Sequence, residues 1–336
     1  MRNTLLVFFV VFITAAASAQ DPNFSQFFAS PLTLNPALTG KFSGTIRAAG
    51  NYRNQWPTIN NAYTTYTASV DAGILKGSIP EFDQFGVGVL GFSDKSGNGV
   101  LQNNAIALST AYHKSLDENG YSQLGLGFQG SFVSKTLDVT RVKFLDQLRA
   151  DGFTGLTSEL FNQSSLNLSY FDLNVGVLFN GSTDGQNNYY VGASMYHITR
   201  PKESFNGGTY ILDPRLTVQA GGRLPLAEFN AVHFSAIHSR QANAVNTVIG
   251  GAYMMNINQD LQDPTNLYFG SWFRLGDAVI PYIGLEFGSL HFGATYDVNM
   301  SSLKPGSNMR GGAEISLIYT KKPADAYAKD VLCPKF

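Results

Sequence analysis

Histidines are the residues of this sequence whose types and spacing could mark an active site. There are five: His113, His197, His233, His238 and His291. His233 and His238 stand five residues apart, which places them on opposite faces of a strand, so they cannot hold one metal ion together there. The sequence has no His-Glu-x-x-His pair, no Gly-x-Ser-x-Gly turn and no P-loop. A Ser/His/Asp triad has no fixed spacing, but nothing selects one, so we predict no enzyme, no metal site and no cofactor.

Glycines and the single cysteine offer little more chemistry. Gly86-Val87-Gly88 and Gly125-Leu126-Gly127 are similar to phosphate loops in composition, but neither precedes a helix start. Glycine in a strand more often admits a bulky neighbour or another backbone, and we expect that role. Cys333 is the only cysteine, so an internal disulfide and a cysteine-ligated zinc site are excluded. A reactive thiol, an intermolecular disulfide and a small buried residue remain open for it.

The elements that would position these residues show a period of two. In 290–299 apolar residues alternate with polar or small ones, and 171–180 repeats the pattern. Each such strand has one apolar and one polar face. About fourteen segments follow, each near the ten residues of a tilted membrane strand. Their expected starts are Gly44, Asn61, Gln84, Leu101, Tyr121, Leu166, Asn188, Asp213, Asn230, Ala244, Asn266, Ala278, Leu290 and Asn308.

A transmembrane antiparallel β-barrel accounts for this all-β pattern better than a soluble β-sandwich, which is the alternative. Isolated charges on the polar faces would point into a lumen, while the apolar faces meet lipid. Aromatic residues near strand ends suit interfacial girdles, namely Tyr52, Trp56, Tyr63, Tyr189, Tyr190, Tyr268 and Trp272. With 23 basic and 24 acidic residues, the chain is not expected to bind nucleic acid. The charged residues expected to face the lumen are Arg47, Arg53, Asp172, Arg215, Arg223, Arg274, Glu286, Asp297 and Glu314.

The two ends of the chain predict its compartment. Residues 1–19 have a short basic start, an apolar run and the small-x-small sequence Ala17-Ser18-Ala19, as a cleaved signal peptide does. The apolar run is shorter than the roughly twenty residues of a membrane helix. We therefore expect export, followed by insertion of a barrel over 44–320 into the outer membrane. An even number of strands would leave the tail 321–336 in the periplasm.

Two segments interrupt the series of strands. Residues 135–165 are predicted to form an external loop or a plug, with a short helix over 140–150. Residues 20–43 are aromatic and contain Pro31 and Pro36, which fix the local geometry. Asn35 precedes a proline, so it is extended, and its side chain can cap a turn. We predict that 20–43 plugs the lumen, and a periplasmic strap is the alternative. The plug residues are Phe24, Phe27, Phe28, Asn35, Pro36 and Ala37.

Motifs at both ends resemble a known family. The chain has Gln20-Asp21-Pro22 and Phe24-Ser25-Gln26-Phe27 near its start, then Asn35-Pro36-Ala37-Leu38-Thr39-Gly40. Its end, Cys333-Pro334-Lys335-Phe336, and the first strand, with Arg47, Tyr52, Arg53, Gln55 and Trp56, add to the likeness. Together they resemble the PorP/SprF family of Bacteroidetes outer-membrane proteins. The Asn-Pro-Ala element is also similar to one in the N-terminal hatch of FadL-type transporters, whose barrels have fourteen strands.

The resemblance implies a part in the type IX secretion system, which exports proteins that carry a C-terminal signal domain. It implies a binding and anchoring barrel for a cognate surface protein, such as a gliding adhesin with a type B domain, and contacts with periplasmic components of the machinery. The alternative is a FadL-like, hatch-gated transporter of hydrophobic small molecules. A third hypothesis, an outer-membrane hydrolase, lacks a recognisable nucleophile.

Overall fold

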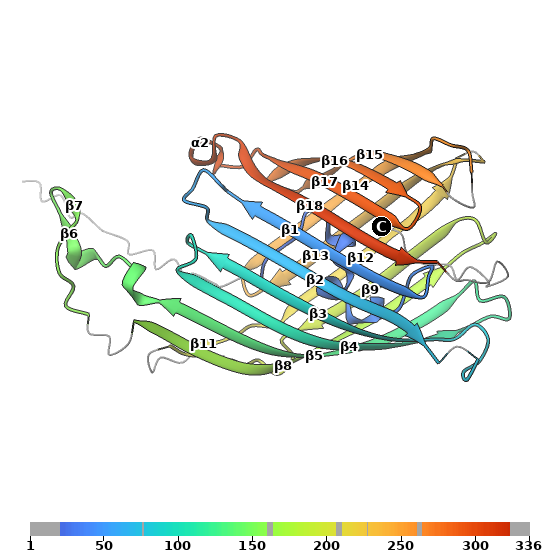
Figure 1. Ribbon diagram of the computed structural model, residues 1–336, viewed down its shortest axis with the longest axis horizontal. Coiled ribbons are helices and arrows are strands. Elements are labelled where there is room, and N and C mark those ends of the chain that lie inside the picture. The colour runs from blue at the N-terminus through green and yellow to red at the C-terminus, as the bar shows by residue number, and fades with distance from the viewer. Residues whose placement is uncertain are drawn as a thin grey trace, which may run out of the picture.

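A closed barrel forms the body of the protein (Figure 1). The computed structural model describes residues 21–75, 77–159, 164–205, 210–226, 228–260 and 264–322. The expected signal peptide and the C-terminal residues Cys333, Pro334 and Phe336 lie outside this part. Fourteen of the described strands pair with antiparallel neighbours, in the order β1-β18-β17-β16-β15-β14-β13-β12-β9-β8-β5-β4-β3-β2, and β2 closes on β1. No described helix is long and apolar enough to cross a membrane.

The barrel strands begin within two residues of the starts expected from the sequence, so the predicted fold is confirmed. They are β1 (Ile46–Gln55), β2 (Tyr63–Ile74), β3 (Gln84–Ser96), β4 (Leu101–Ser115), β5 (Gln123–Asp138), β8 (Ser165–Gly181), β9 (Asn188–Tyr196), β12 (Arg215–Pro225), β13 (Asn230–Gln241), β14 (Ala244–Asn256), β15 (Thr265–Arg274), β16 (Ala278–Phe287), β17 (Leu290–Asn299) and β18 (Arg310–Lys321).

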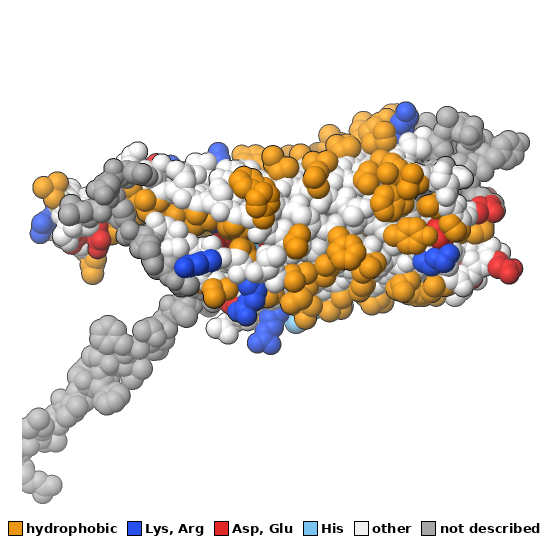
Figure 2. Space-filling model, turned by 90° about the horizontal axis from the view of Figure 1, so that it is seen from below, with side chains coloured by type: hydrophobic (Ala, Val, Ile, Leu, Met, Phe, Trp, Pro, Cys, Tyr) orange, Lys and Arg blue, Asp and Glu red, His pale blue; other side chains and the backbone are white. Residues whose placement is uncertain are grey.

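Alternation along each strand separates a lipid-facing wall from a polar lumen. On β5, Leu126 and Phe128 are exposed on the outside, while Gln129 and Ser131 are buried inside. Apolar side chains cover much of the visible outer wall (Figure 2). An apolar outer surface costs little in lipid, and the closed ladder leaves the membrane-spanning backbone paired.

The two ends of the barrel differ in the length of their connections. One end carries 139–164 and 197–214, together with α2 (Lys304–Ser307), and we call it the long-loop end (Figure 1). The other, short-turn end is where β1 begins and β18 ends. Outer-membrane barrels keep their longer loops outside the cell. We therefore expect the long-loop end to face the cell exterior.

The expected helix over 140–150 is wrong. The segment holds two short 3-10 turns, η3 (Val139–Arg141) and η4 (Leu145–Gln147), and the hairpin β6 (Leu148–Arg149) with β7 (Gly152–Phe153). A helix of this length is marginal without a packed face. Hydrogen bonds stabilise the turns, because the Asp146 carboxylate accepts from Thr157 and Ser158. A second small hairpin, β10 (Lys202–Glu203) with β11 (Tyr210–Ile211), lies in 197–214.

The N-terminal segment 21–42 lies inside the barrel, where Figure 1 shows it in blue behind β1 and β2. It consists of η1 (Phe27–Ala29), α1 (Pro31–Leu34) and η2 (Pro36–Leu38). Asp21 donates its backbone N–H to Gln241, the last residue of β13 at the long-loop end. Gly40 donates its N–H to Asp71 of β2, toward the short-turn end. The segment therefore spans much of the height of the lumen.

Among the aromatic residues expected in interfacial girdles, Tyr190 of β9 is buried at 3% exposure, and two residues of β15 also lie in the lumen. Trp272 is 0% exposed and Tyr268 is 1% exposed. Both belong to the core cluster that contains Phe27. Their positions on β15 fall on its inward face, so proximity to a strand end was a misleading signal.

Candidate functional site

Aromatic packing fixes the first part of the N-terminal segment. The centroid of the Phe28 ring lies 5.0 Å from that of Trp272 and 5.6 Å from that of Tyr282, which it meets edge-on. Phe24 and Phe27 are both nearly fully buried. Edge-on and tilted aromatic pairs of this kind add about 0.5–1.5 kcal/mol each beyond their buried area. The segment is thus anchored to β15 and β16 by ring contacts.

Asn35 fixes the middle of the segment. Its extended backbone places the side-chain Oδ1 as an acceptor for the N–H of Ala37 at 2.8 Å, which caps η2. Its Nδ2 donates to the carbonyls of Val177 on β8 (3.0 Å) and Ala193 on β9 (3.2 Å). Pro31 and Pro36 occupy first-turn positions of α1 and η2, where the missing N–H costs nothing. One side chain therefore both caps a turn and ties the segment to the wall.

Glycines on the inner wall allow this close approach. A Cβ placed at Gly127 of β5 would stand 2.3 Å from backbone atoms of Pro36 and Ala37. One placed at Gly176 of β8 would stand 1.8 Å from Oδ1 of Asn35, and one at Gly86 of β3 would stand 2.2 Å from the carbonyl oxygen of Thr39. The expectation that the glycine-rich strands admit another backbone is confirmed.

A buried ion cluster holds the segment near the long-loop end. Arg53 contacts Asp297 at 2.8 Å and Glu314 at 3.1 Å. Arg274 also contacts Asp297, at 2.7 Å. Ser25 joins the segment to these groups, because its N–H donates to Glu314 at 2.7 Å and its hydroxyl donates to Asp297 at 2.6 Å. Charges buried in this way are stable only with partners.

A second buried pair holds the other end of the segment. Arg47 grips Asp71 in a two-pronged contact, with Nε at 2.9 Å and Nη2 at 2.7 Å. Asp71 also accepts the N–H of Gly40 at 2.7 Å, and Arg47 donates to the carbonyl of Leu38 at 3.0 Å. The strands that carry this pair are neighbours in the barrel, so wall and segment are joined at one point.

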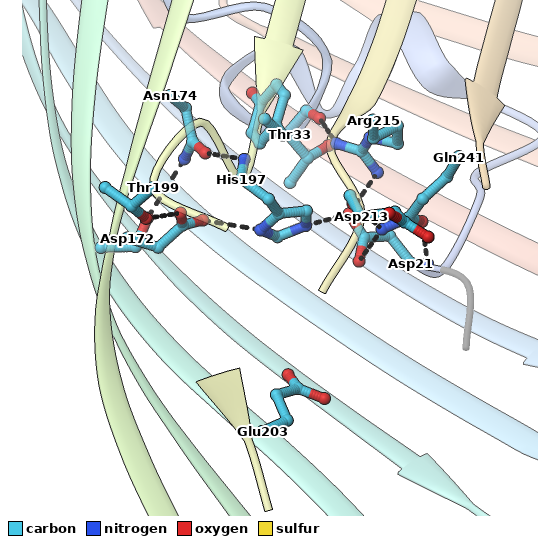
Figure 3. A network of polar contacts seen from close by, with 12 residues as sticks. Asp21, Thr33, Asp172, Asn174, His197, Thr199, Glu203, Asp213, Arg215 and Gln241 are labelled. Carbon is cyan, nitrogen blue, oxygen red and sulfur yellow. Dashed lines mark hydrogen bonds and ion pairs between the residues drawn. The ribbon is translucent and has the colours of Figure 1, made fainter. Parts of the chain in front are cut away.

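A third polar network, which we call the mouth clamp, surrounds Asp21 (Figure 3). The ring of His197 lies between two carboxylates, 2.8 Å from Asp21 and 2.6 Å from Asp172. Arg215 approaches Asp21 at 3.2 Å and donates to the carbonyl of Thr33 at 3.0 Å. Gln241 accepts the N–H of Asp21 at 2.8 Å. The clamp thus joins Asp21 to residues of β8, β12 and β13 and to His197, which follows β9.

Electrostatics favour the charged form of the clamp. Burial alone would lower the pKa of His197, but Asp21 and Asp172 outweigh it and raise this pKa to about 9. Burial alone would raise the pKa of Asp21, but His197 and Arg215 outweigh it and lower that pKa. His197 is therefore an imidazolium at neutral pH and forms ion pairs on both sides.

The other predicted charges also lie on inward faces of their strands. Arg223 donates to the carbonyl of Gln186, in the turn after β8. Glu286 accepts hydrogen bonds from Asn266 and Tyr268. These two are not part of the clusters that hold the N-terminal segment. Within the described ranges, no group of three His, Asp, Glu or Cys side chains is arranged to hold a metal ion.

Sequence reasoning missed the acidic partners on which the segment depends. Asp71 lies at an inward position of β2, and Asp21 lies directly before Pro22. Neither is among the charged residues that the sequence predicts to face the lumen. The signal for Asp71 was available, because it occupies the polar register of an alternating strand, as the selected charges do. His197 had no such signal, because it follows the end of β9 in a left-handed conformation (φ 60°).

Comparison with known proteins places the chain in a family. It resembles solved barrels at low identity. The Ralstonia pickettii toluene transporter TbuX matches at 9% identity over 88% of this chain and 93% of that chain, with a TM-score of 0.48. A Pseudomonas aeruginosa FadL homologue matches at 11% identity over 85% of this chain and 92% of that chain, with a TM-score of 0.43. CdiB from Acinetobacter baumannii also matches (8% identity, 82% of this chain, TM-score 0.36), and the chain spans 60% of its length. No curated protein sequence matches.

The family model described as "Type IX secretion system membrane protein PorP/SprF" matches residues 16–319. That range covers the N-terminal segment and nearly the whole barrel. This family consists of membrane proteins of a secretion system and is not a class of enzymes. The chain therefore belongs to the PorP/SprF family of type IX secretion system membrane proteins, and it is an outer-membrane β-barrel.

Proposed function

We propose that this protein receives and holds one cognate surface protein of the type IX secretion system at its long-loop end. On this proposal the N-terminal segment 21–42 is a fixed plug, and the barrel is an anchoring platform. The partner is an exported protein with a C-terminal signal domain, of the adhesin type. Periplasmic components of the machinery would contact the short-turn end.

The observation that carries the proposal is the attachment of the segment at both ends and in the middle. At its two ends the segment donates backbone N–H groups to buried carboxylates, from Ser25 to Glu314 of the Arg53 cluster and from Gly40 to Asp71 of the Arg47–Asp71 pair. Between these ends, Asn35 donates two hydrogen bonds to the wall, to the carbonyls of Val177 and Ala193. Displacement of the whole segment would break the bonds of Ser25, Asn35 and Gly40 to the wall and would leave the buried carboxylates without these donors. A barrel of this kind suits binding at its mouth better than passage through its lumen.

The long-loop end also offers surface for a protein partner. Leu145 is 81% exposed and Leu156 is 92% exposed, although both are large apolar residues. Leu148, Phe153, Tyr210 and Ile211 in the same loops are exposed as well. We take these exposed apolar side chains as the surface that a protein partner would cover. The hairpin of β6 and β7 extends beyond the strands that form the barrel wall (Figure 1).

Affinity purification from outer membranes tests the proposal. The tagged wild-type barrel should retain an exported protein with a C-terminal signal domain. The double variant Leu145→Ser and Leu156→Ser should lose most of it. Leu226→Ser is the matched control, because Leu226 is an exposed leucine (62%) at the short-turn end. Equal recovery with all three proteins, or no exported protein with the wild type, would contradict the proposal.

The alternative is a transporter of hydrophobic small molecules. It predicts ligand-dependent uptake that fails when the gene is deleted, while export and display of surface proteins remain intact. Measuring both phenotypes in one deletion strain separates the two functions. Loss of surface display with unchanged uptake supports the anchoring platform.

A further inference from the structure

One barrel strand is much longer than its neighbour. β8 covers Ser165–Gly181, whereas β9 covers only Asn188–Tyr196. β8 pairs with β5 from Ser165 to Asn180, but with β9 only from Val175 to Gly181. Among the described residues, 165–172 of β8 therefore have a paired strand on one side only. This stretch lies toward the long-loop end (Figure 1).

The chain after β9 turns away before it could cover this edge. The N–H of Ile198 donates to the carbonyl of Leu173 at 3.1 Å, which extends the contact by one step. The N–H of Arg200 then donates back to the carbonyl of His197 at 3.0 Å and closes a turn. Next, β10 lies over the inner face, where Glu203 accepts hydrogen bonds from Lys135 and Tyr170. For the part of this loop that the structure describes, contact with the edge of β8 thus ends at about Asp172.

The register shows which backbone groups the edge presents. In an antiparallel strand, successive residues direct their N–H and C=O groups to opposite sides. The carbonyl of Leu173 points to the β9 side, because it accepts the N–H of Ile198, which lies just after β9. Asn167, Ser169 and Phe171 share this register and point the same way. No described residue forms a hydrogen bond to their backbone groups.

We propose that this open edge of β8, from Asn167 to Phe171, is the docking site for one extended strand of the bound surface protein. The inference rests on the proposed function and deepens it. The docked strand would continue the β8–β9 ladder beyond the point where β9 ends. A row of N–H and C=O groups at alternate residues matches the backbone of another extended strand.

Two features of the edge agree with this occupant. Natural edge strands are usually blunted by charge, proline or a bulge, yet 167–171 reads Asn-Leu-Ser-Tyr-Phe and has none of these devices. On the outer face, the Phe171 and Phe132 rings pack at 5.1 Å, and Phe171 is 77% exposed. A neighbouring strand would cover this ring as a cross-strand partner. The edge of β8 can therefore pair with another strand, and none of these devices prevents that pairing.

Amide hydrogen exchange of the purified barrel, alone and with the surface protein that the wild type retains, tests the docking. The amides of Asn167, Ser169 and Phe171 should exchange fast in the free barrel and at least about tenfold more slowly in the complex. The amides of Leu168 and Tyr170 face β5 and should be slow in both states. Slow exchange at the three edge amides in the free barrel, or no slowing in the complex, would overturn the proposal.

A proline variant gives a second, independent readout. Ser169→Pro removes an edge N–H without removing a bond to β5, and its ring obstructs an incoming strand. Binding of the surface protein should weaken about tenfold or more, while Ser169→Ala should bind as the wild type. Protected Leu168 and Tyr170 amides would show that Ser169→Pro is folded. Unchanged binding by Ser169→Pro rejects the edge but leaves the proposed function standing. A wild-type barrel that retains no surface protein rejects both.

Discussion

Gly127→Ala should loosen the N-terminal segment without altering the barrel wall. The added Cβ would stand 2.3 Å from the backbone of Pro36 and Ala37, so the segment must move about 1 Å to restore an ordinary contact. A shift of that size stretches the Asn35 hydrogen bonds to Val177 and Ala193 from 3.0 and 3.2 Å to beyond hydrogen-bonding distance. Overpacking costs about 1–3 kcal/mol, and the stretched bonds add about 1 kcal/mol. We expect a loss of about 2–4 kcal/mol in the free energy that holds the segment in place.

The matched control is Gly130→Ala on the same strand. A Cβ there would meet only the side chain of Leu173, at 3.8 Å, on the outer face. Its effect should stay within about 0.5 kcal/mol. Gly127→Ala and Gly130→Ala thus make the same chemical change on opposite faces of one strand.

Tryptophan fluorescence during urea unfolding provides the assay. The chain has two tryptophans, and Trp272 is buried against Phe28 of the segment. With Trp56 replaced by Phe, the emission of Trp272 should shift to longer wavelength at lower urea in Gly127→Ala than in Gly130→Ala. Loss of β-sheet circular dichroism should follow later. Identical Trp272 transitions in the two variants would refute the packing argument.

Three further perturbations test the contacts of the segment. Arg53→Met should lower the free energy of urea unfolding by about 3–5 kcal/mol, because it leaves buried Asp297 and Glu314 without their shared cation. The control Arg223→Met should lower it by less than about 1 kcal/mol, and equal effects of the two variants would contradict this. Asn35→Asp should cost about 1–3 kcal/mol by the same measurement, since both Nδ2 bonds are lost, and a neutral result would reject the role of Asn35. His197 has a raised pKa of about 9, so its stabilisation is complete below its ordinary value of 6.5 and is lost as the pH rises through about 9. A spin label attached at Asn23→Cys, in a chain with Cys333 replaced by Ser, should become more mobile as the pH rises through about 9. The same label should show no such pH-dependent change when His197→Gln is added.

Period-two alternation predicted the barrel well, because one residue in two must face lipid along every strand. It placed strand starts within two residues even at β16, which contains Pro281. Alternation also predicted the inward register of Arg53, Arg274 and Glu314. It could not predict that these side chains meet, because they come from β1, β15 and β18, and only closure of β1 on β18 brings them together.

Features that depend on tertiary contacts could not be predicted from the sequence. Trp272 resembled a girdle residue, because aromatic residues favour both interfaces and cores. The helix expected over 140–150 did not form, because local turn and hairpin contacts replaced a helix with nothing to pack against. The step between β8 and β9 was also invisible, since strand length depends on the partner strand. By contrast, Asn35 before Pro36 was readable, because proline restricts its backbone and the amide can cap the turn that follows.

A disulfide lock tests most directly whether the barrel works with its plug in place. The hydroxyls of Thr39 in the segment and Ser109 on β4 lie 2.5 Å apart, so Thr39→Cys with Ser109→Cys can form a bond that ties the segment to the wall. Display of the cognate surface protein should be the same for the oxidised double variant, either single variant and the wild type. Display that is lost in the oxidised double variant and returns on reduction would contradict a fixed plug.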